Sequence, residues 1–304
     1  MSTEFDTLTT EEHRPDLADI DRRSTIDIAR AMNAEDSRVP GAVAEQLPRI
    51  AAAIDAAADR MARGGRLIYL GAGTAGRLGV LDASECPPTF NTGPDEVMGL
   101  IAGGPTALIS AVEGAEDSKE LAAEDLTALG LTPDDVVVGV SASGRTPYAV
   151  GAVEHAAELG ALTVGVSCNA DSPLAAAADH GIEVVVGPEL IAGSTRLKAG
   201  TAQKLVLNMI STITMVRLGK TYGNLMVDVR ASNEKLRARS RRIVAVATDA
   251  PADTVEHALT ATGGEVKDAI LSILGDVDAP TARRLLTETH GHLRAALRLA
   301  LSPS

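Results

Sequence analysis

The sequence is poor in the residues that build several common kinds of binding site. Its 304 residues contain no Trp, two Phe and three Tyr, so it lacks the aromatic side chains on which nucleic-acid bases stack. The formal net charge is −13, which opposes binding to DNA, RNA or anionic membranes. We therefore expect neither a nucleic acid nor a membrane among its partners.

Cysteine and long apolar runs are scarce as well. The two cysteines, Cys86 and Cys168, form no CxxC motif, and the six histidines are scattered, so neither a disulfide framework nor a metal site is expected. No run reaches the roughly 18 apolar residues of a membrane span. The acidic first residues lack the apolar core of a signal peptide. The sequence predicts a cytoplasmic protein without a metal or other cofactor.

Short apolar runs alternate with longer helical stretches through the middle of the chain. The runs lie at 66–70, 97–102, 135–140, 161–166 and 182–187. Such alternation is typical of βαβ units, so we expect an α/β fold with a parallel sheet and helices on both faces. After Pro251, residues 259–270 resemble residues 286–297. Two copies are too few for a solenoid, and they predict a small helical domain of two helix–turn–helix units.

A glycine-rich turn, Gly71–Arg77, follows the first apolar run. Its glycines match the dinucleotide fingerprint, but the acidic residue expected at the end of the second strand is missing. Gly73, Thr74 and Arg77 fit a monophosphate or a sugar hydroxyl better, because a helix N-terminus offers unpaired N–H groups to an anion. The alternative is a turn that serves only tight packing.

A serine-rich loop follows the third apolar run. Ser141, Ser143 and Thr146 each carry a hydroxyl, Gly144 lets the backbone approach a ligand, and Pro147 suits the first turn of a helix. One hydroxyl would be enough for an ordinary helix cap. Three hydroxyls within six residues favour an anion cradle.

Two carboxylates are candidates for acid–base chemistry. Glu85 precedes Pro87 and Pro88, which are expected to end the helix that starts at the first turn. Glu116 stands just before another expected helix, where an acidic residue also complements the helix dipole without any catalytic role. The sequence alone does not indicate whether the two side chains meet.

Seven ordered blocks, taken together, resemble the N-acetylmuramic acid 6-phosphate etherase family. The most specific is Asp82–Phe90, with its Ser-Glu-Cys-Pro-Pro sequence. The others lie at 10–15, 71–79, 101–104, 112–117, 141–146 and 193–201. The family usually has Asn before the first proline, whereas this chain has Arg14.

The resemblance implies a sugar isomerase (SIS) domain, a flavodoxin-like five-stranded parallel sheet that binds phosphosugars. We accordingly expect four parts along the chain. They are an N-terminal helical segment (1–56), the SIS domain (57–220), a connecting helix (221–250) and a small helical domain (251–304). The resemblance also implies a metal-free cytoplasmic homodimer.

The family is a group of lyases that act in peptidoglycan recycling. They cleave the D-lactyl ether of N-acetylmuramic acid 6-phosphate, giving N-acetylglucosamine 6-phosphate and D-lactate by elimination and water addition. By resemblance, Glu85 is the proton donor to lactate and Glu116 is the second catalytic carboxylate, acting as the base at C2. An aldose–ketose isomerase or a non-catalytic phosphosugar sensor on the same fold remain the alternatives, because the fold alone does not decide function.

Overall fold

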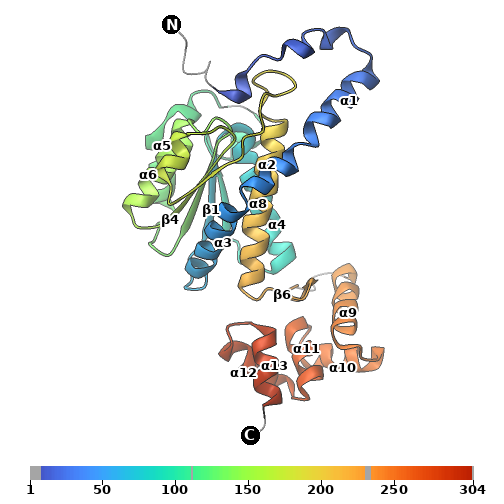
Figure 1. Cartoon of the computed structure of the whole chain (residues 1–304). Helices are drawn as coiled ribbons and strands as arrows, with labels where there is room; N and C mark the ends of the chain where they lie inside the picture. Colours follow the sequence, from blue (N-terminus) through green and yellow to red (C-terminus); the bar gives the residue numbers. More distant parts are fainter. Residues whose placement is uncertain (1–7, 111, 230–233, 303–304) are drawn as a thin grey trace. The chain divides into compact units, whose positions relative to one another are not determined.

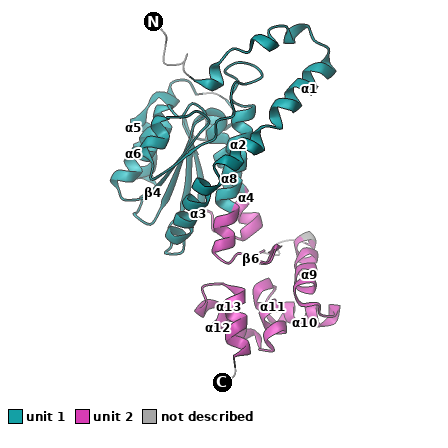
Figure 2. Ribbon diagram, viewed as in Figure 1, with its two compact units in different colours: residues 1–84, 95–211 teal, residues 85–94, 212–304 magenta. Residues whose placement is uncertain are grey.

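The computed structural model describes residues 8–110, 112–229 and 234–302, which belong to two compact units (Figures 1 and 2). The first unit consists of Met1–Ser84 and Asp95–Ser211, and the second of Glu85–Pro94 and Thr212–Ser304. The expected α/β fold with helices after the sheet is confirmed. The division at residues 56, 220 and 250 stays a prediction.

Five parallel strands form the sheet of the first unit, in the order β2-β1-β3-β4-β5. They are β1 (Leu67–Gly71), β2 (Val97–Ile101), β3 (Val136–Val140), β4 (Leu162–Ser167) and β5 (His180–Glu183). This is the flavodoxin-like order that the resemblance implied. The first four strands match the apolar runs, because a sheet covered on both faces needs apolar side chains at nearly every position. The fifth was expected at 182–187 but runs over 180–183, where it pairs with β4.

Helices cover both faces of the sheet (Figure 1). Ile68 and Leu70 of β1 point to one face and pack with α5 (Lys119–Ala128) and α6 (Pro147–Glu158). Successive residues of a strand point to opposite faces, so Tyr69 lies on the other side.

A buried polar contact ties β1 to two helices on that second face. The Tyr69 hydroxyl donates to Asp82 of α4 (Gly73–Phe90) at 2.8 Å. Asn208 of α8 (Lys198–Arg217) donates to the same carboxylate at 2.6 Å. Burial raises the pKa of Asp82, while the hydrogen bonds from Tyr69 and Asn208 act in the opposite direction. The network fixes α4, and hence the turn from which it starts.

The N-terminal helices are α1 (Thr25–Asp36), α2 (Val39–Glu45) and α3 (Leu47–Met61), and a buried ion pair joins α1 to α8. Lys198 Nζ lies 2.8 Å from Glu35, and the two residues are only 2% and 6% exposed. Arg14 approaches the same carboxylate at 3.1 Å. Although burial alone would raise the pKa of Glu35, Lys198 and Arg14 hold that pKa below its usual range.

Among the C-terminal helices, α10 with α11 and α12 with α13 repeat one helix–turn–helix motif. The helices of this region are α9 (Glu234–Thr248), α10 (Ala252–Ala261), α11 (Val266–Gly275), α12 (Ala279–Glu288) and α13 (Leu293–Leu301). In the turn after α10, the Thr262 hydroxyl donates to Ala258 O at 2.9 Å, and after α12 the Thr289 hydroxyl donates to Leu285 O at 2.8 Å. The two expected helix–turn–helix units are confirmed. Their core also contains Val227 and Val244, which precede Pro251.

The expectation that Pro87 and Pro88 end the helix is wrong. α4 continues to Phe90 with both prolines inside it. Each proline removes one backbone N–H···O=C bond, but its fixed φ of about −65° is helical, so the chain can continue for the last turn. The helix stops at Asn91, whose left-handed φ of 53° is a common way to end a helix. Glu85 therefore stands within a helix rather than at a chain reversal.

Candidate active site

The two turns that the sequence singled out lie at neighbouring strand ends. β1 and β3 are paired so that Gly71 is opposite Val140. β1 leads into Ala72-Gly73-Thr74, and β3 leads into Ser141. The next strand beside β1 is β2, and the next strand beside β3, in the opposite direction across the sheet, is β4. Ligands of such sheets bind in the crevice where the strand order reverses in this way.

The loop after β3 brings three hydroxyls to one place. Ser141 Oγ lies 3.2 Å from Ser143 Oγ and 2.8 Å from Thr146 Oγ1. The backbone N–H groups of Gly144 and Arg145 donate to Ser141 Oγ and Ser143 Oγ, at 3.0 and 3.1 Å. Directly after this loop, α6 begins at Pro147. Hydroxyl donors at the positive end of a helix form a suitable cradle for a phosphate.

Glycine is required at position 144 of this loop. Its φ is +68°, a left-handed conformation that strains other residues. A Cβ at this position would lie 2.3 Å from the Ser172 Cβ, so there is no room for a side chain. Gly144 thus shapes the hydroxyl loop.

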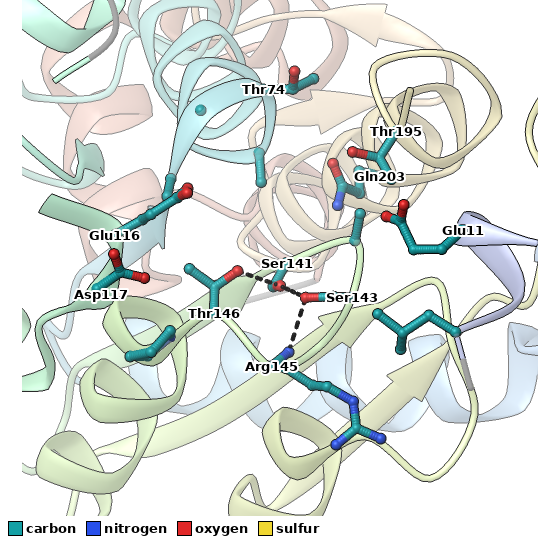
Figure 3. Close-up of a pocket in the computed structure, with 16 residues that line it drawn as sticks. Glu11, Thr74, Glu116, Asp117, Ser141, Ser143, Arg145, Thr146, Thr195 and Gln203 are labelled. Atoms are coloured by element: carbon teal, nitrogen blue, oxygen red, sulfur yellow. Dashed lines mark hydrogen bonds between the residues drawn. The ribbon is translucent and has the colours of Figure 1, made fainter. Parts of the chain in front are cut away.

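A cavity of about 490 Å³ opens above this loop, within the usual range for small-molecule sites. Glu116 and Asp117 form one wall, and Glu11, Thr195 and Gln203 lie on the opposite side, with the hydroxyl loop between them (Figure 3). Thr74 lines the cavity from the start of α4. All of these residues belong to the first unit.

Comparisons with known proteins connect this cavity to one family. Residues 49–157 match the model of the glucokinase regulatory protein N-terminal SIS domain, and residues 116–213 match the SIS domain model. An N-acetylmuramic acid 6-phosphate etherase of Streptomyces avermitilis is 76% identical, over 99% of this chain and 96% of the relative. The chain belongs to the N-acetylmuramic acid 6-phosphate etherase family. Etherases of Rubrobacter xylanophilus and Serratia proteamaculans are 61% and 57% identical, over 98% and 95% of this chain and 98% of each relative.

Among solved structures, the fold is similar to that of a phosphoheptose isomerase from Francisella tularensis. The TM-score is 0.52 at 21% identity, with 64% of this chain and all of that chain covered. This likeness concerns the SIS fold alone.

The cavity of this etherase-family chain brings together most of the residues that the sequence indicated. Six of the nine predicted site residues line it, namely Gly73, Thr74, Glu116, Ser141, Ser143 and Thr146. Gly144 belongs to the hydroxyl loop without lining the cavity. Their roles toward a ligand stay predictions.

Two predicted site residues lie outside both the cavity lining and the hydroxyl loop. The Arg77 guanidinium donates to the backbone carbonyls of Leu108 and Ala107, at 3.0 and 2.7 Å, and so holds the loop after β2. Glu85 is exposed and follows Thr74 on α4 by about three helical turns. Glu85 can therefore act in catalysis only if it reaches the substrate from outside the lining of this cavity.

Sequence reasoning missed several residues of the cavity. Glu11, Thr195 and Gln203 approach from segments far apart in the chain, and Asp117 and Arg145 stand next to predicted residues. A signal existed for Glu11 and Thr195, since both lie in blocks that resemble the family. Gln203 stands two residues beyond the last of those blocks, and nothing in the sequence pointed to it.

Within the described residues, no group of three or more His, Cys, Asp or Glu side chains is arranged to hold a metal ion. In the same part of the chain, no helix has the length and apolar character needed to cross a membrane.

Proposed function

We propose that this protein cleaves the D-lactyl ether of N-acetylmuramic acid 6-phosphate, giving N-acetylglucosamine 6-phosphate and D-lactate. The observation that carries this proposal is a cavity in which a hydroxyl cradle at a helix N-terminus stands beside Glu116. The high identity to curated etherases over nearly the whole chain supports it. We also propose that the protein acts in the cytoplasm.

The reaction requires acid–base catalysis because an alkoxide is a poor leaving group. In the open-chain sugar, the C2 proton is α to the C1 aldehyde and can be removed by a carboxylate. We assign this step to Glu116. The C3–O bond then breaks as an acid protonates the departing lactate oxygen, and water adds to C3 of the α,β-unsaturated aldehyde. Efficient catalysis needs one carboxylate and one carboxylic acid at the same pH.

We infer that the acid is Glu85 and that a second copy of the chain supplies it. Glu85 is exposed and does not line the cavity that contains Glu116. In a symmetric dimer, a residue that is remote from its own site can complete the partner's site. A homodimer would thus account for both carboxylates of the mechanism.

Isotopes test the reaction itself. In deuterated water the sugar product should carry deuterium at C2, because Glu116 exchanges its proton with solvent before reprotonation. In oxygen-18 water the label should appear at C3, because water replaces the lactate oxygen there. Mass spectrometry and NMR of both products provide the measurement. Oxygen-18 in lactate would place the cleavage on the lactate side of the ether and contradict the elimination.

The phosphate cradle predicts a specific kinetic change. Ser143→Ala should raise KM about tenfold with little change in kcat, because a hydrogen bond to a charged phosphate is lost equally in the ground and transition states. Steady-state lactate release measures both constants. Ser302→Ala is the matched control, since the Ser302 hydroxyl donates to Arg298 O on α13, outside the cavity. Equal turnover of the phosphorylated and unphosphorylated sugars would contradict the cradle.

A further inference from the structure

The side of the cavity that faces Glu116 carries an unused hydrogen-bond donor. Gln203 of α8 is 1% exposed, and its amide nitrogen has no hydrogen-bond partner among the described residues. A buried amide N–H without a partner costs free energy, so native proteins rarely retain one without a reason. Gln203 lines the cavity, and a ligand acceptor there would satisfy this group.

A hydrogen-bond acceptor lines the same cavity. Glu11 comes from the N-terminal segment, and its carboxylate points into the same side of the cavity as Gln203 (Figure 3). The backbone around Glu11 is well anchored, since Thr10 O accepts from Gly193 N at 3.1 Å and the Thr10 hydroxyl accepts from Asn169 Nδ2 at 3.1 Å. Gly193 leaves the space for the carboxylate, because a Cβ there would lie 2.5 Å from Glu11 Oε2.

The charges of the substrate limit what Glu11 can face. The phosphate and the lactyl carboxylate are anions and would be repelled by a third carboxylate. Glu11 must therefore meet a neutral donor. A donor from one residue and an acceptor from another complement a secondary amide, which presents its C=O and its N–H on opposite edges.

The stereochemistry at C2 is compatible with this group. For Glu116 to remove the C2 proton, the C2–H bond must point to the wall that carries Glu116. The other bonds of a tetrahedral carbon then point away from that wall. The C2–N bond is one of these three, so a pose with the acetamido group on the side of Glu11 and Gln203 is compatible with proton removal by Glu116.

We propose that Glu11 and Gln203 form a subsite for the acetamido group on C2 of the sugar. The Gln203 amide N–H donates to the acetyl oxygen, and the Glu11 carboxylate accepts from the amide N–H. This inference rests on the proposed function for the orientation of C2, and it assigns the specificity for an N-acetylated amino sugar to two residues that do not take part in proton transfer.

Binding of two sugar phosphates that differ only at C2 tests the subsite. Titration calorimetry on the full chain would use N-acetylglucosamine 6-phosphate and glucose 6-phosphate. The unmodified protein should prefer the acetamido sugar. Glu11→Gln should weaken its binding about 3- to 10-fold, because the acceptor oxygen stays but its charge is lost, and Gln203→Met should weaken it by a similar factor. Affinity for glucose 6-phosphate should change less than threefold in either variant.

Two matched variants control this experiment. Glu12→Gln removes the neighbouring carboxylate, which is exposed and outside the cavity, and should leave both affinities unchanged. Ser143→Ala removes a phosphate contact that both sugars share, and should weaken both equally. Glu11 is exposed, so Glu11→Gln keeps the test valid even where Gln203→Met disturbs folding.

Equal affinity of the unmodified protein for the two sugars would overturn the subsite, and so would an equal loss for both sugars in Glu11→Gln. These results are distinct from a failure of the proposed reaction. A protein that prefers the acetamido sugar but releases no lactate would keep the subsite and lose the reaction. A protein that releases lactate without that preference would keep the reaction and lose the subsite.

Discussion

Glu116→Ala is expected to reduce both lactate release and deuterium exchange at C2 by about 10²- to 10⁴-fold, the usual loss on removal of a general base. Both should fall together because elimination begins with removal of the C2 proton. Glu85→Ala should reduce lactate release by a similar factor while exchange at C2 continues, because the base remains and only the acid is lost. NMR in deuterated water follows exchange, and an enzymatic assay follows lactate.

Glu113→Ala is the matched control for this pair, since Glu113 is exposed and lies three residues before Glu116 but outside the cavity. It should retain normal rates of both processes. Near-normal lactate release by Glu85→Ala would contradict its assignment as the acid. Continued exchange in Glu116→Ala would contradict its assignment as the base.

Mixing the two inactive variants tests whether the carboxylates come from different copies. If Glu85 acts on the partner's cavity, a mixed dimer of Glu85→Ala and Glu116→Ala chains contains one complete site. Random exchange of subunits should then restore about a quarter of the unmodified activity, since half of the dimers are mixed and each has one working site. If both carboxylates act within one chain, mixing restores nothing.

Lys198→Met is expected to lower the free energy of unfolding by about 3 kcal/mol, because it leaves the buried Glu35 carboxylate without its closest charge partner. The loss falls at the lower end of the range for a broken buried pair, since Arg14 still contacts Glu35. Urea-induced unfolding measured by circular dichroism provides the value.

Arg38→Ala serves as the control, because Arg38 is 71% exposed and lies 3.6 Å from the same carboxylate. Exposed ion pairs contribute little, so its effect should stay below about 0.5 kcal/mol. The double variant Lys198→Met with Glu35→Gln should regain much of the lost stability, since the uncompensated charge is gone. An unchanged unfolding midpoint in Lys198→Met would show that this ion pair does not stabilise the fold.

Local patterns in the sequence were enough to predict four of the five strands to within one residue, and both turns that line the cavity. Valines 136–138 and the apolar run at 67–70 fill a layer buried on both faces, and such a layer leaves a continuous apolar signal in the chain. Gly73 and Ser141 were also recognisable from short segments of sequence. Each turn follows its own strand directly, so its small or hydroxyl-bearing residues stand next to the apolar run that predicts the strand. Local chemistry was therefore enough to predict the parallel sheet and the two loops that line the cavity.

Which side chains share the cavity depends on long-range packing. Arg77 looked like a ligand for an anion, yet nearby carbonyls of another loop take up its guanidinium. Glu11 and Gln203 are separated by most of the chain, and they line one cavity because Thr10 is held by Gly193 and Asn169 while α8 starts close by. Strand and turn signals are local in sequence, whereas a binding site is made by long-range packing that no short pattern encodes.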